Sequence, residues 1–295
     1  MSSIPVWPHF APITLEMARE ITPRLLQLPD GLSEYSFAGL YLFRDRYNYQ
    51  VSLYEDLLII SGCRDGQRFF ITPCCRVGEQ VLCELFKTHT YWKLVSPSFV
   101  AANDGFFDSA GWQVEEDRDN FDYLYLRTEL AALSGKKFHK KKNHINGFLL
   151  SYPDYHLRDL GPDTREDARI VLEDWGRKEL NPEQTDLAAS HEALDLLEFF
   201  DMRGQVLYVG DVPVAWCLAE PVADGRIVAV HFEKARTDIR GAYQFINYCF
   251  ARSLPDTVEY INREQDLGDE GMRQAKMSYR PAGFVRKYRV YPRQV

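Results

Sequence analysis

The sequence predicts an α+β protein built from mixed, mostly antiparallel sheets that are flanked by helices. Of its 295 residues, 45% are hydrophobic and 26% charged, a globular composition with room for one large domain or two of about 150 residues each. Short runs rich in Tyr, Phe, Val and Ile alternate with turn residues over residues 35–72, which is typical of an antiparallel meander. Further along, Gly210-Asp211 and Gly225-Arg226 separate three more such runs.

The first block of elements begins with a helix, for which Leu15, Ala18, Leu25 and Leu26 supply the apolar positions. Charged turns separate the strands that follow, and helical and extended patterns then alternate. The expected elements are a helix at 15–28, strands at 35–43, 47–54, 57–62 and 68–72, a helix at 78–87, a strand at 92–95, a helix at 99–107 and strands at 112–116 and 122–126.

The second block starts with a helical segment that leads into a bridge. Gly161, Pro162 and Asp163 then provide a turn and a cap for the next helix, and Pro182 follows its end. The expected elements are a helical segment at 128–146, an extended segment at 148–155, helices at 164–179 and 191–200, strands at 205–209, 212–220 and 227–232, a helix at 244–253, a strand at 257–261, a short helix at 270–279 and a strand pair at 284–291.

Several classes of protein are not expected from this composition. No apolar run approaches the ~20 residues needed to cross a bilayer, and residues 1–8 lack the basic and apolar regions of a secretory signal, so we expect a cytoplasmic protein. None of the six cysteines forms a C-x-x-C pair, and no histidine pair at metal spacing accompanies them. We therefore expect no metal site, and the absence of G-x-G-x-x-G gives no reason to expect a nicotinamide or flavin cofactor.

Positive charge is concentrated in one segment of an otherwise acidic chain. The formal net charge is −8, yet one nine-residue stretch contains five lysines and two histidines. Clustered positive charge suits the backbone of tRNA or an anionic head group, and it equally suits a solvated basic helix. The candidate contacts are Lys136, Lys137, Lys140, Lys141 and Lys142.

A loop and a helix near residue 240 form a candidate anion site. Gly241 permits a tight turn and Arg240 offers a fork of hydrogen-bond donors, while Ala242 leads into the helix whose first backbone amides attract negative charge. Arg236 lies one turn of the loop earlier. The alternative is a capping turn with solvated arginines.

Two titratable residues alternate along the strand that precedes this loop. His231 and Glu233 are two positions apart, so we expect both to face the same side of the sheet. Either could accept a proton from an acceptor amine or hydroxyl. The alternative for Glu233 is a solvated carboxylate or a pair with a neighbouring arginine.

The order of the last elements resembles the GNAT acyltransferase fold: three antiparallel strands, an Arg- and Gly-containing loop, a helix, a strand, a short helix with a tyrosine and a final strand pair. Four motifs are similar to a narrower family, built on the C-terminal domain of phosphatidylglycerol lysyltransferase. They are FEKA at 232–235, IRGAYQ at 239–244, NRE at 262–264 and KMSYRP at 276–281.

This resemblance implies two GNAT-like domains in tandem. Residues 1–160 would form a degenerate N-terminal domain with the basic bridge, and residues 161–295 the C-terminal domain with the active site. It also implies transfer of an acyl group from an aminoacyl-tRNA or acyl-CoA donor to an amine or hydroxyl of a small-molecule, lipid or peptide acceptor. The alternatives are a small-molecule N-acetyltransferase that uses acetyl-CoA, and an inactive GNAT pair that binds tRNA, anionic lipid or a protein partner.

The resemblance also implies roles for residues near the end of the chain. Tyr279 occupies the position of the tyrosine that protonates the leaving thiolate in many GNAT enzymes, and Lys276 lies on the same helical face, where it could contact a phosphate or carboxylate. Residues at the end of the preceding strand would contact the acceptor or form a hydrated loop; these are Asn262, Arg263 and Glu264.

The loop departs from the acetyl-CoA signature of ordinary GNAT enzymes, Q/R-x-x-G-x-G/A. Only Gly241 matches a glycine of that pattern. Asp238 replaces the first polar residue and would repel a pyrophosphate, and Tyr243 replaces the last small residue and would crowd it. The fold is therefore predicted more firmly than the use of CoA.

Overall fold

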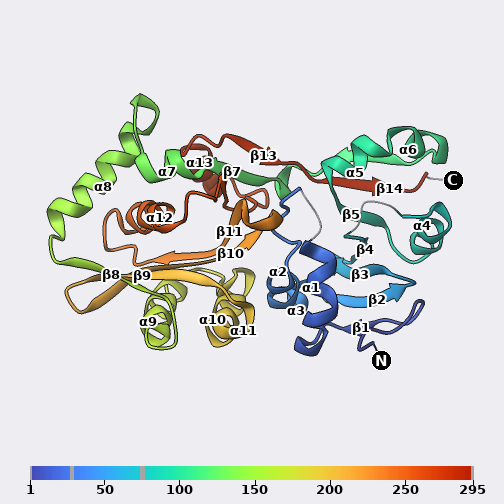
Figure 1. Ribbon diagram of the computed structural model, residues 1–295, viewed down its shortest axis with the longest axis horizontal. Helices are drawn as coiled ribbons and strands as arrows, with labels where there is room; N and C mark the ends of the chain where they lie inside the picture. Colours follow the sequence, from blue (N-terminus) through green and yellow to red (C-terminus); the bar gives the residue numbers. More distant parts are fainter. Residues whose placement is uncertain (1, 27–29, 74–76, 294–295) are drawn as a thin grey trace.

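The computed structural model describes residues 2–26, 30–73 and 77–293, which form two lobes around two sheets (Figure 1). Each sheet has seven strands in the described residues. The first contains, in spatial order, β1 (Ala11–Pro12), β2 (Gln50–Tyr54), β3 (Leu57–Arg64), β4 (Gln67–Ile71), β5 (Tyr91–Val95), β14 (Tyr288–Tyr291) and β6 (Gln113–Glu116). The second contains β8 (Tyr155–Asp159), β9 (Arg203–Val209), β10 (Val212–Val222), β11 (Ile227–Ala235), β12 (Tyr260–Asn262), β7 (Asp122–Leu126) and β13 (Gly283–Val285).

Both sheets follow the same plan. Four consecutive antiparallel strands lead to one parallel pair, β4 with β5 in the first sheet and β11 with β12 in the second. Beyond each parallel pair lie two antiparallel strands. The predicted α+β class with mixed, mostly antiparallel sheets is confirmed.

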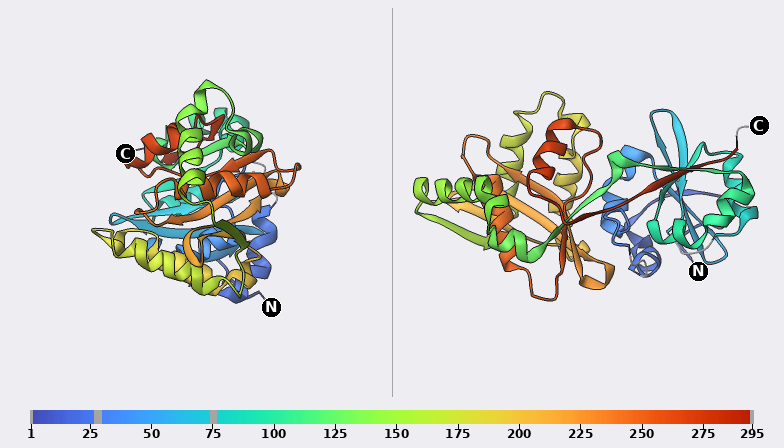
Figure 2. Two further views of the ribbon diagram at one scale, coloured as in Figure 1. Left: turned by 90° about the vertical axis from the view of Figure 1, so that its left-hand side faces the viewer. Right: turned by 90° about the horizontal axis from the view of Figure 1, so that it is seen from above.

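The two lobes exchange their last strands. β6 stays at the edge of the first sheet whereas β7, which follows it in sequence, joins the second; β13 stays in the second sheet and β14 returns to the first. The two connections run side by side between the lobes, where the amide of Asp117 donates to the carbonyl of Lys287 at 2.8 Å (Figure 2). The chain thus passes from the first sheet to the second between Glu116 and Asp122, and neither lobe has a complete sheet without the other.

Buried charge lies at this crossing. Asp122, with no exposed surface, accepts hydrogen bonds from Ser33, Asn262, Gln265 and the Lys287 ammonium, whose Nζ is 2.6 Å from the carboxylate. Lys287 is also fully buried and pairs in addition with Glu34. Burial by itself would lower the pKa of Lys287, but the two carboxylates outweigh it and raise that pKa.

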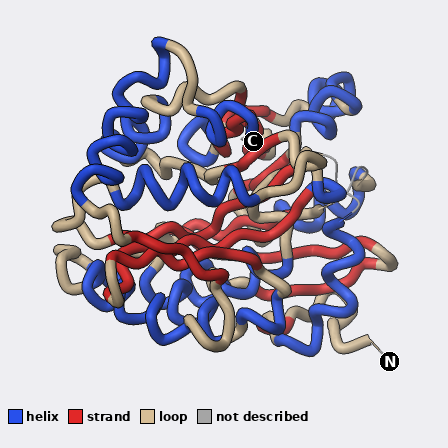
Figure 3. The backbone as a smooth tube through the Cα atoms, turned by 60° about the vertical axis from the view of Figure 1, so that its left-hand side comes forward, coloured by secondary structure: helices blue, strands red, loops and turns tan. Residues whose placement is uncertain are grey.

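Helices cover both faces of the second sheet (Figure 3). α9 (Arg165–Gly176) and α10 (Leu187–Asp195) pack on one face and α12 (Ala242–Ser253) on the other. The described helices of the first lobe are α1 (Ala18–Leu26), α2 (Phe37–Leu42), α3 (Arg44–Tyr47), α4 (Glu79–Phe86), α5 (Pro97–Ala102) and α6 (Asp104–Ala110). The remaining ones of the second are α7 (Arg127–Ala132), α8 (His139–Ser151), α11 (Leu197–Phe200) and α13 (Glu270–Met277).

Two expected extended segments are helical. The strand expected at 35–43 is helix α2, capped by the Ser36 hydroxyl, which accepts from the Gly39 amide at 2.9 Å. Nearly every residue of this segment is buried, and a short, fully apolar run does not distinguish a buried helix from a buried strand. The segment expected to be extended at 148–155 continues α8 as far as Ser151.

Candidate functional site

The site forms where β11 and β12 part. The two strands pair in parallel only from Ile227 opposite Tyr260 to Ala229 opposite Asn262. Beyond that point Glu233 extends from β11 and Arg263 directly follows β12, and the guanidinium Nη2 donates to Glu233 Oε1 at 2.9 Å. An ion pair thus spans the gap between the diverging strands.

This ion pair is held from α12 and is largely shielded from solvent. Asn247 of α12 donates to the second oxygen of Glu233 at 3.2 Å. The side chains of Arg263 and Glu233 are 15% and 10% exposed. Burial would lower the pKa of Arg263, but the Glu233 carboxylate outweighs it, so the guanidinium stays charged. The predicted Glu233 and Arg263 therefore come together at one point.

Tyr279 packs against the same guanidinium. Its ring centroid lies 5.0 Å from Arg263 Cζ and 3.9 Å from the ammonium nitrogen of Lys141. Burial raises the pKa of Tyr279 to about 12, although the charge of Arg263 opposes the rise, so the hydroxyl keeps its proton at neutral pH. Burial and the charge of Arg263 lower the pKa of Lys141 to about 8, so in mildly alkaline solution Lys141 is neutral in a fraction of the protein molecules.

The lysine-rich segment and the arginine–glycine loop meet beside these groups. α8 packs against the start of α12 so closely that a Cβ on Gly241, whose φ is +87°, would lie 2.9 Å from the carbonyl oxygen of His144. Burial, and after it the charges of Lys141 and Arg240, lower the pKa of His144. Two separately predicted basic features therefore form one positive surface next to the diverging strands.

The remaining predicted lysines and loop residues differ in exposure. Lys136, Lys137, Lys140 and Lys142 are exposed, as is Arg240, and Lys137 in addition pairs with Glu129. Other loop residues have local roles: Arg236 pairs with Asp238 at 3.0 Å, and Ala242 is buried as the first residue of α12.

His231 does not share the surroundings of Glu233. The pairing of β10 with β11 shifts register between Leu218 and Ala219, which leaves His231 as the extra residue of a β-bulge and breaks the strict alternation along the strand. Its Nε2 lies 2.7 Å from Glu220 and its Nδ1 2.7 Å from Glu264.

The two carboxylates keep the His231 ring protonated. Burial alone would lower its pKa, but the two hydrogen-bonded carboxylates raise it to about 10. An imidazolium has no free lone pair, so this geometry removes the reason for predicting His231 as a base.

Three predicted contact residues serve the protein's own backbone or its core. The ammonium of Lys276 donates to the carbonyl oxygens of Arg263, at 2.6 Å, and of Gln265. Asn262 is fully buried and donates to Gly31 and Asp122. With Glu264 bound to His231, these side chains fix the loop that carries Arg263.

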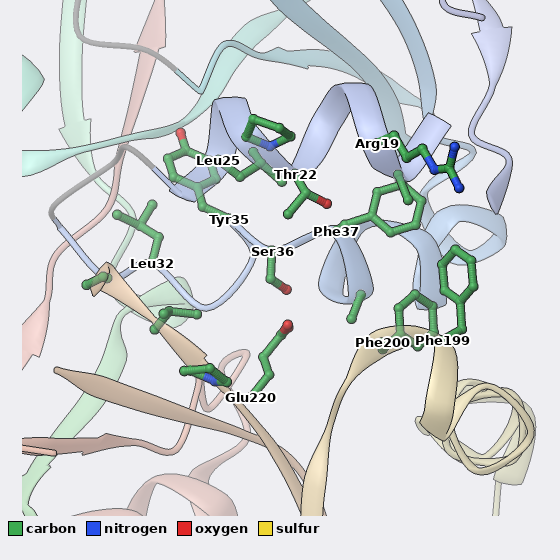
Figure 4. A pocket seen from close by; sticks show the side chains of 17 residues that line it. Arg19, Thr22, Leu25, Leu32, Tyr35, Ser36, Phe37, Phe199, Phe200 and Glu220 are labelled. Atoms are coloured by element: carbon green, nitrogen blue, oxygen red, sulfur yellow. The ribbon is translucent and has the colours of Figure 1, made fainter. Parts of the chain in front are cut away.

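A pocket of about 420 Å³ opens between the lobes on the other side of the bulge (Figure 4). It is lined by apolar side chains from α1, α2, α11 and the end of β10, and Arg19 and Glu220 are its charged lining residues. Sequence reasoning missed this pocket because its walls come from segments almost two hundred residues apart. One signal was present: Glu220 is a lone carboxylate at the end of an apolar run.

Within the described residues, no helix combines the length and apolarity needed to cross a membrane. Nor do those residues bring together three or more His, Cys, Asp or Glu side chains that could hold a metal ion.

The model of the family described as phosphatidylglycerol lysyltransferase, C-terminal, matches residues 27–291. The chain belongs to this family. The resemblance inferred from the motifs between residues 232 and 281 is thereby confirmed. An uncharacterized protein of Mycoplasmoides gallisepticum is 24% identical over 181 residues, an alignment that covers 60% of this chain and 57% of that curated relative.

Solved structures agree with membership of the phosphatidylglycerol lysyltransferase C-terminal family. A conserved protein of unknown function from Bacteroides thetaiotaomicron is 32% identical, with a TM-score of 0.85 and coverage of 96% of this chain and 99% of that one. The C-terminal domain of a putative lysylphosphatidylglycerol synthetase from Agrobacterium fabrum is 12% identical, with a TM-score of 0.63 and coverage of 94% and 92%.

FemX is 8% identical, with a TM-score of 0.59 and 97% coverage of both chains. At this identity the likeness concerns the fold alone. The predicted fold of tandem GNAT-like domains is confirmed.

Proposed function

We propose that the protein transfers an acyl or aminoacyl group from an activated donor to an amine or hydroxyl acceptor, at the point where β11 and β12 diverge. The observation that carries this proposal is the convergence of Arg263, Glu233, Tyr279 and Lys141 there. Membership of the phosphatidylglycerol lysyltransferase C-terminal family supports an acyl-transferring fold. The four converging side chains would provide the positive charge and the proton-handling groups that such a transfer needs.

The proposed reaction needs positive charge and two proton-handling groups. The acceptor attacks the carbonyl carbon of an ester or thioester, and Arg263 and Lys141 stabilise the negative charge that develops on its oxygen. Glu233 orients Arg263 and, with one hydrogen bond from the described residues on each oxygen, retains lone pairs to take the acceptor's proton. As the bond to the leaving group breaks, protonated Tyr279 gives that group its proton.

We expect Tyr279→Phe to slow transfer by about 10²–10⁴-fold, because it removes the proposed proton donor and keeps the ring. Single-turnover consumption of bulk aminoacyl-tRNA, and in parallel of acetyl-CoA, would be followed with a panel of primary amines and alcohols. Tyr125→Phe is the matched control, since Tyr125 is also buried and donates to the carbonyl of Lys276 at 2.8 Å. Equal losses in the two variants would refute the acid role of Tyr279.

The positive surface favours an aminoacyl-tRNA donor in this proposal. Exposed Lys136, in the turn before α8, and exposed Lys140 and Lys142, in the first turn of α8, continue the surface formed by Arg240 and Lys141; α8 lies at the outer side of the second lobe (Figure 1). Clustered cations of this kind bind phosphate backbones even on an acidic protein. Acyl-CoA needs no such extended surface.

We expect the double variant Lys140→Glu, Lys142→Glu to weaken binding of deacylated bulk tRNA at least tenfold in about 0.1 M salt. The slope of log K against log salt should become shallower by about 2, one unit for each lost phosphate contact. Arg46→Glu with Lys87→Glu makes the same change in net charge in the first lobe, at two exposed positions. Equal weakening in both double variants would contradict a specific surface on α8.

A further inference from the structure

The pocket between the lobes is mostly apolar; Arg19 and Glu220 are its charged lining residues, and Thr22, Tyr35 and Ser36 add hydroxyl groups. Leu25, Leu32, Phe37, Phe199 and Val222 are among the side chains that surround it (Figure 4). Its volume of about 420 Å³ lies within the range of small-molecule sites. The exposed side chain of Arg19 belongs to the solvent-facing side of α1, whereas Glu220 extends from β10 toward Ser36 (Figure 4).

Glu220 has an unused hydrogen-bonding oxygen. Its Oε1 lies 2.7 Å from His231 Nε2, and within the described residues its Oε2 accepts no hydrogen bond. The Glu220 side chain is only 13% exposed, so solvent screens this oxygen weakly.

A carboxylate lies at the wall of the pocket. Glu220 shares the one positive charge of the His231 imidazolium with a second carboxylate, Glu264, and the other charged lining residue, Arg19, lies at an exposed position of α1. A carboxylate in weakly screened surroundings attracts a cation and repels an anion more strongly than it would in water. The pocket therefore complements a ligand with an apolar body and a positively charged end.

We propose that this pocket binds a primary amine carried on an apolar body, with the ammonium against Glu220 and the body against Leu32, Phe37 and Val222. This assignment goes beyond the proposed function, because Arg263, Glu233, Tyr279 and Lys141 are not among the described residues that line the pocket. His231 links the pocket to the diverging strands, because it contacts Glu220 on one side and Glu264, the neighbour of Arg263, on the other. The pocket wall and the ion pair of Arg263 with Glu233 are thus joined by consecutive contacts.

The test measures binding without any donor. Calorimetric titration of the full chain would compare 4-phenylbutylamine with 4-phenylbutanol and 4-phenylbutyrate, which share one apolar body and differ in the charge of the end group. We expect the amine to bind about tenfold to a hundredfold more tightly than the alcohol, the range for a charge-assisted hydrogen bond. Equal affinities of amine and alcohol, tighter binding of the carboxylate, or no binding of any probe would overturn the proposal.

Two variants locate the interaction. Glu220→Gln keeps a hydrogen-bonding side chain beside His231 and should abolish the preference for amine over alcohol. Thr22→Phe, on the α1 wall, should fill the pocket and weaken all probes at least tenfold while Glu220 is unchanged. A preference that survives Glu220→Gln, or probe binding that survives Thr22→Phe, would count against the site. A failure of the transfer assays described above would refute the proposed function and leave this pocket assignment intact.

Discussion

Replacing Lys287 by methionine should lower the free energy of unfolding by about 3–5 kcal/mol, the range for breaking a buried ion pair from one side. Methionine fills most of the same space, so the loss comes from charge. Without the ammonium, the fully buried carboxylate of Asp122 and that of Glu34 would face each other with no cation between them. Because Lys287 connects β13 to β14, the weakened point is also where the lobes exchange strands.

Urea denaturation at pH 7 measures this effect. Lys87→Met is the matched control, because Lys87 pairs with Glu84 on the surface, where both side chains are well exposed and such pairs are worth about 0–1 kcal/mol. A loss below about 1 kcal/mol in Lys287→Met, or equal losses in the two variants, would show that the crossing tolerates uncompensated charge.

The exchange of strands could not be predicted from sequence. Residues 112–116 and 122–126 are both expected strands, and a pair joined by a short connection ordinarily forms a hairpin. Nothing local in the alternation of residues 122–126 distinguishes pairing with β6 from pairing with β12. The exchange brings together Asp122 and Lys287, which lie 165 residues apart and meet only in the folded protein, so no local pattern announces it.

The candidate site was predicted where its residues belong to local motifs. Glu233 lies near the end of β11, Arg263 directly follows β12 and Tyr279 follows α13, and the fold brings these three positions together. The bulge at His231 was not visible, because nearly every residue of β11 is buried and the strand shows no alternation of buried and exposed positions that an extra residue could interrupt. Glu220 was missed because its importance depends on α1 and α2, which belong to the other lobe.

The His231 imidazolium should make the protein less stable as the pH rises from 6.5 to 10. Its pKa is about 10 in the folded protein and about 6.5 in an unfolded chain, so the folded state holds the proton more tightly. The resulting stabilisation is fully present below pH 6.5 and is lost as the pH rises through 10, with a total of roughly 5 kcal/mol. Three lysines oppose this trend, because burial lowers their pKa values to about 8 and makes their charged forms costly. The protein therefore gains stability as the pH rises and these lysines lose their protons. They are Lys93, Lys141 and Lys276.

The contribution of His231 is therefore measured as a difference between two proteins. The gap in unfolding free energy between the unmodified chain and His231→Gln should be largest near pH 6.5 and should narrow by roughly 4 kcal/mol toward pH 10, because the lysines act equally in both proteins. His139→Gln, at an exposed position in the first turn of α8, should show no such change. A gap that stays constant over this range would mean that His231 is neutral in the folded protein. That result would restore a free lone pair to His231 and, with it, the base role that the two carboxylates now argue against.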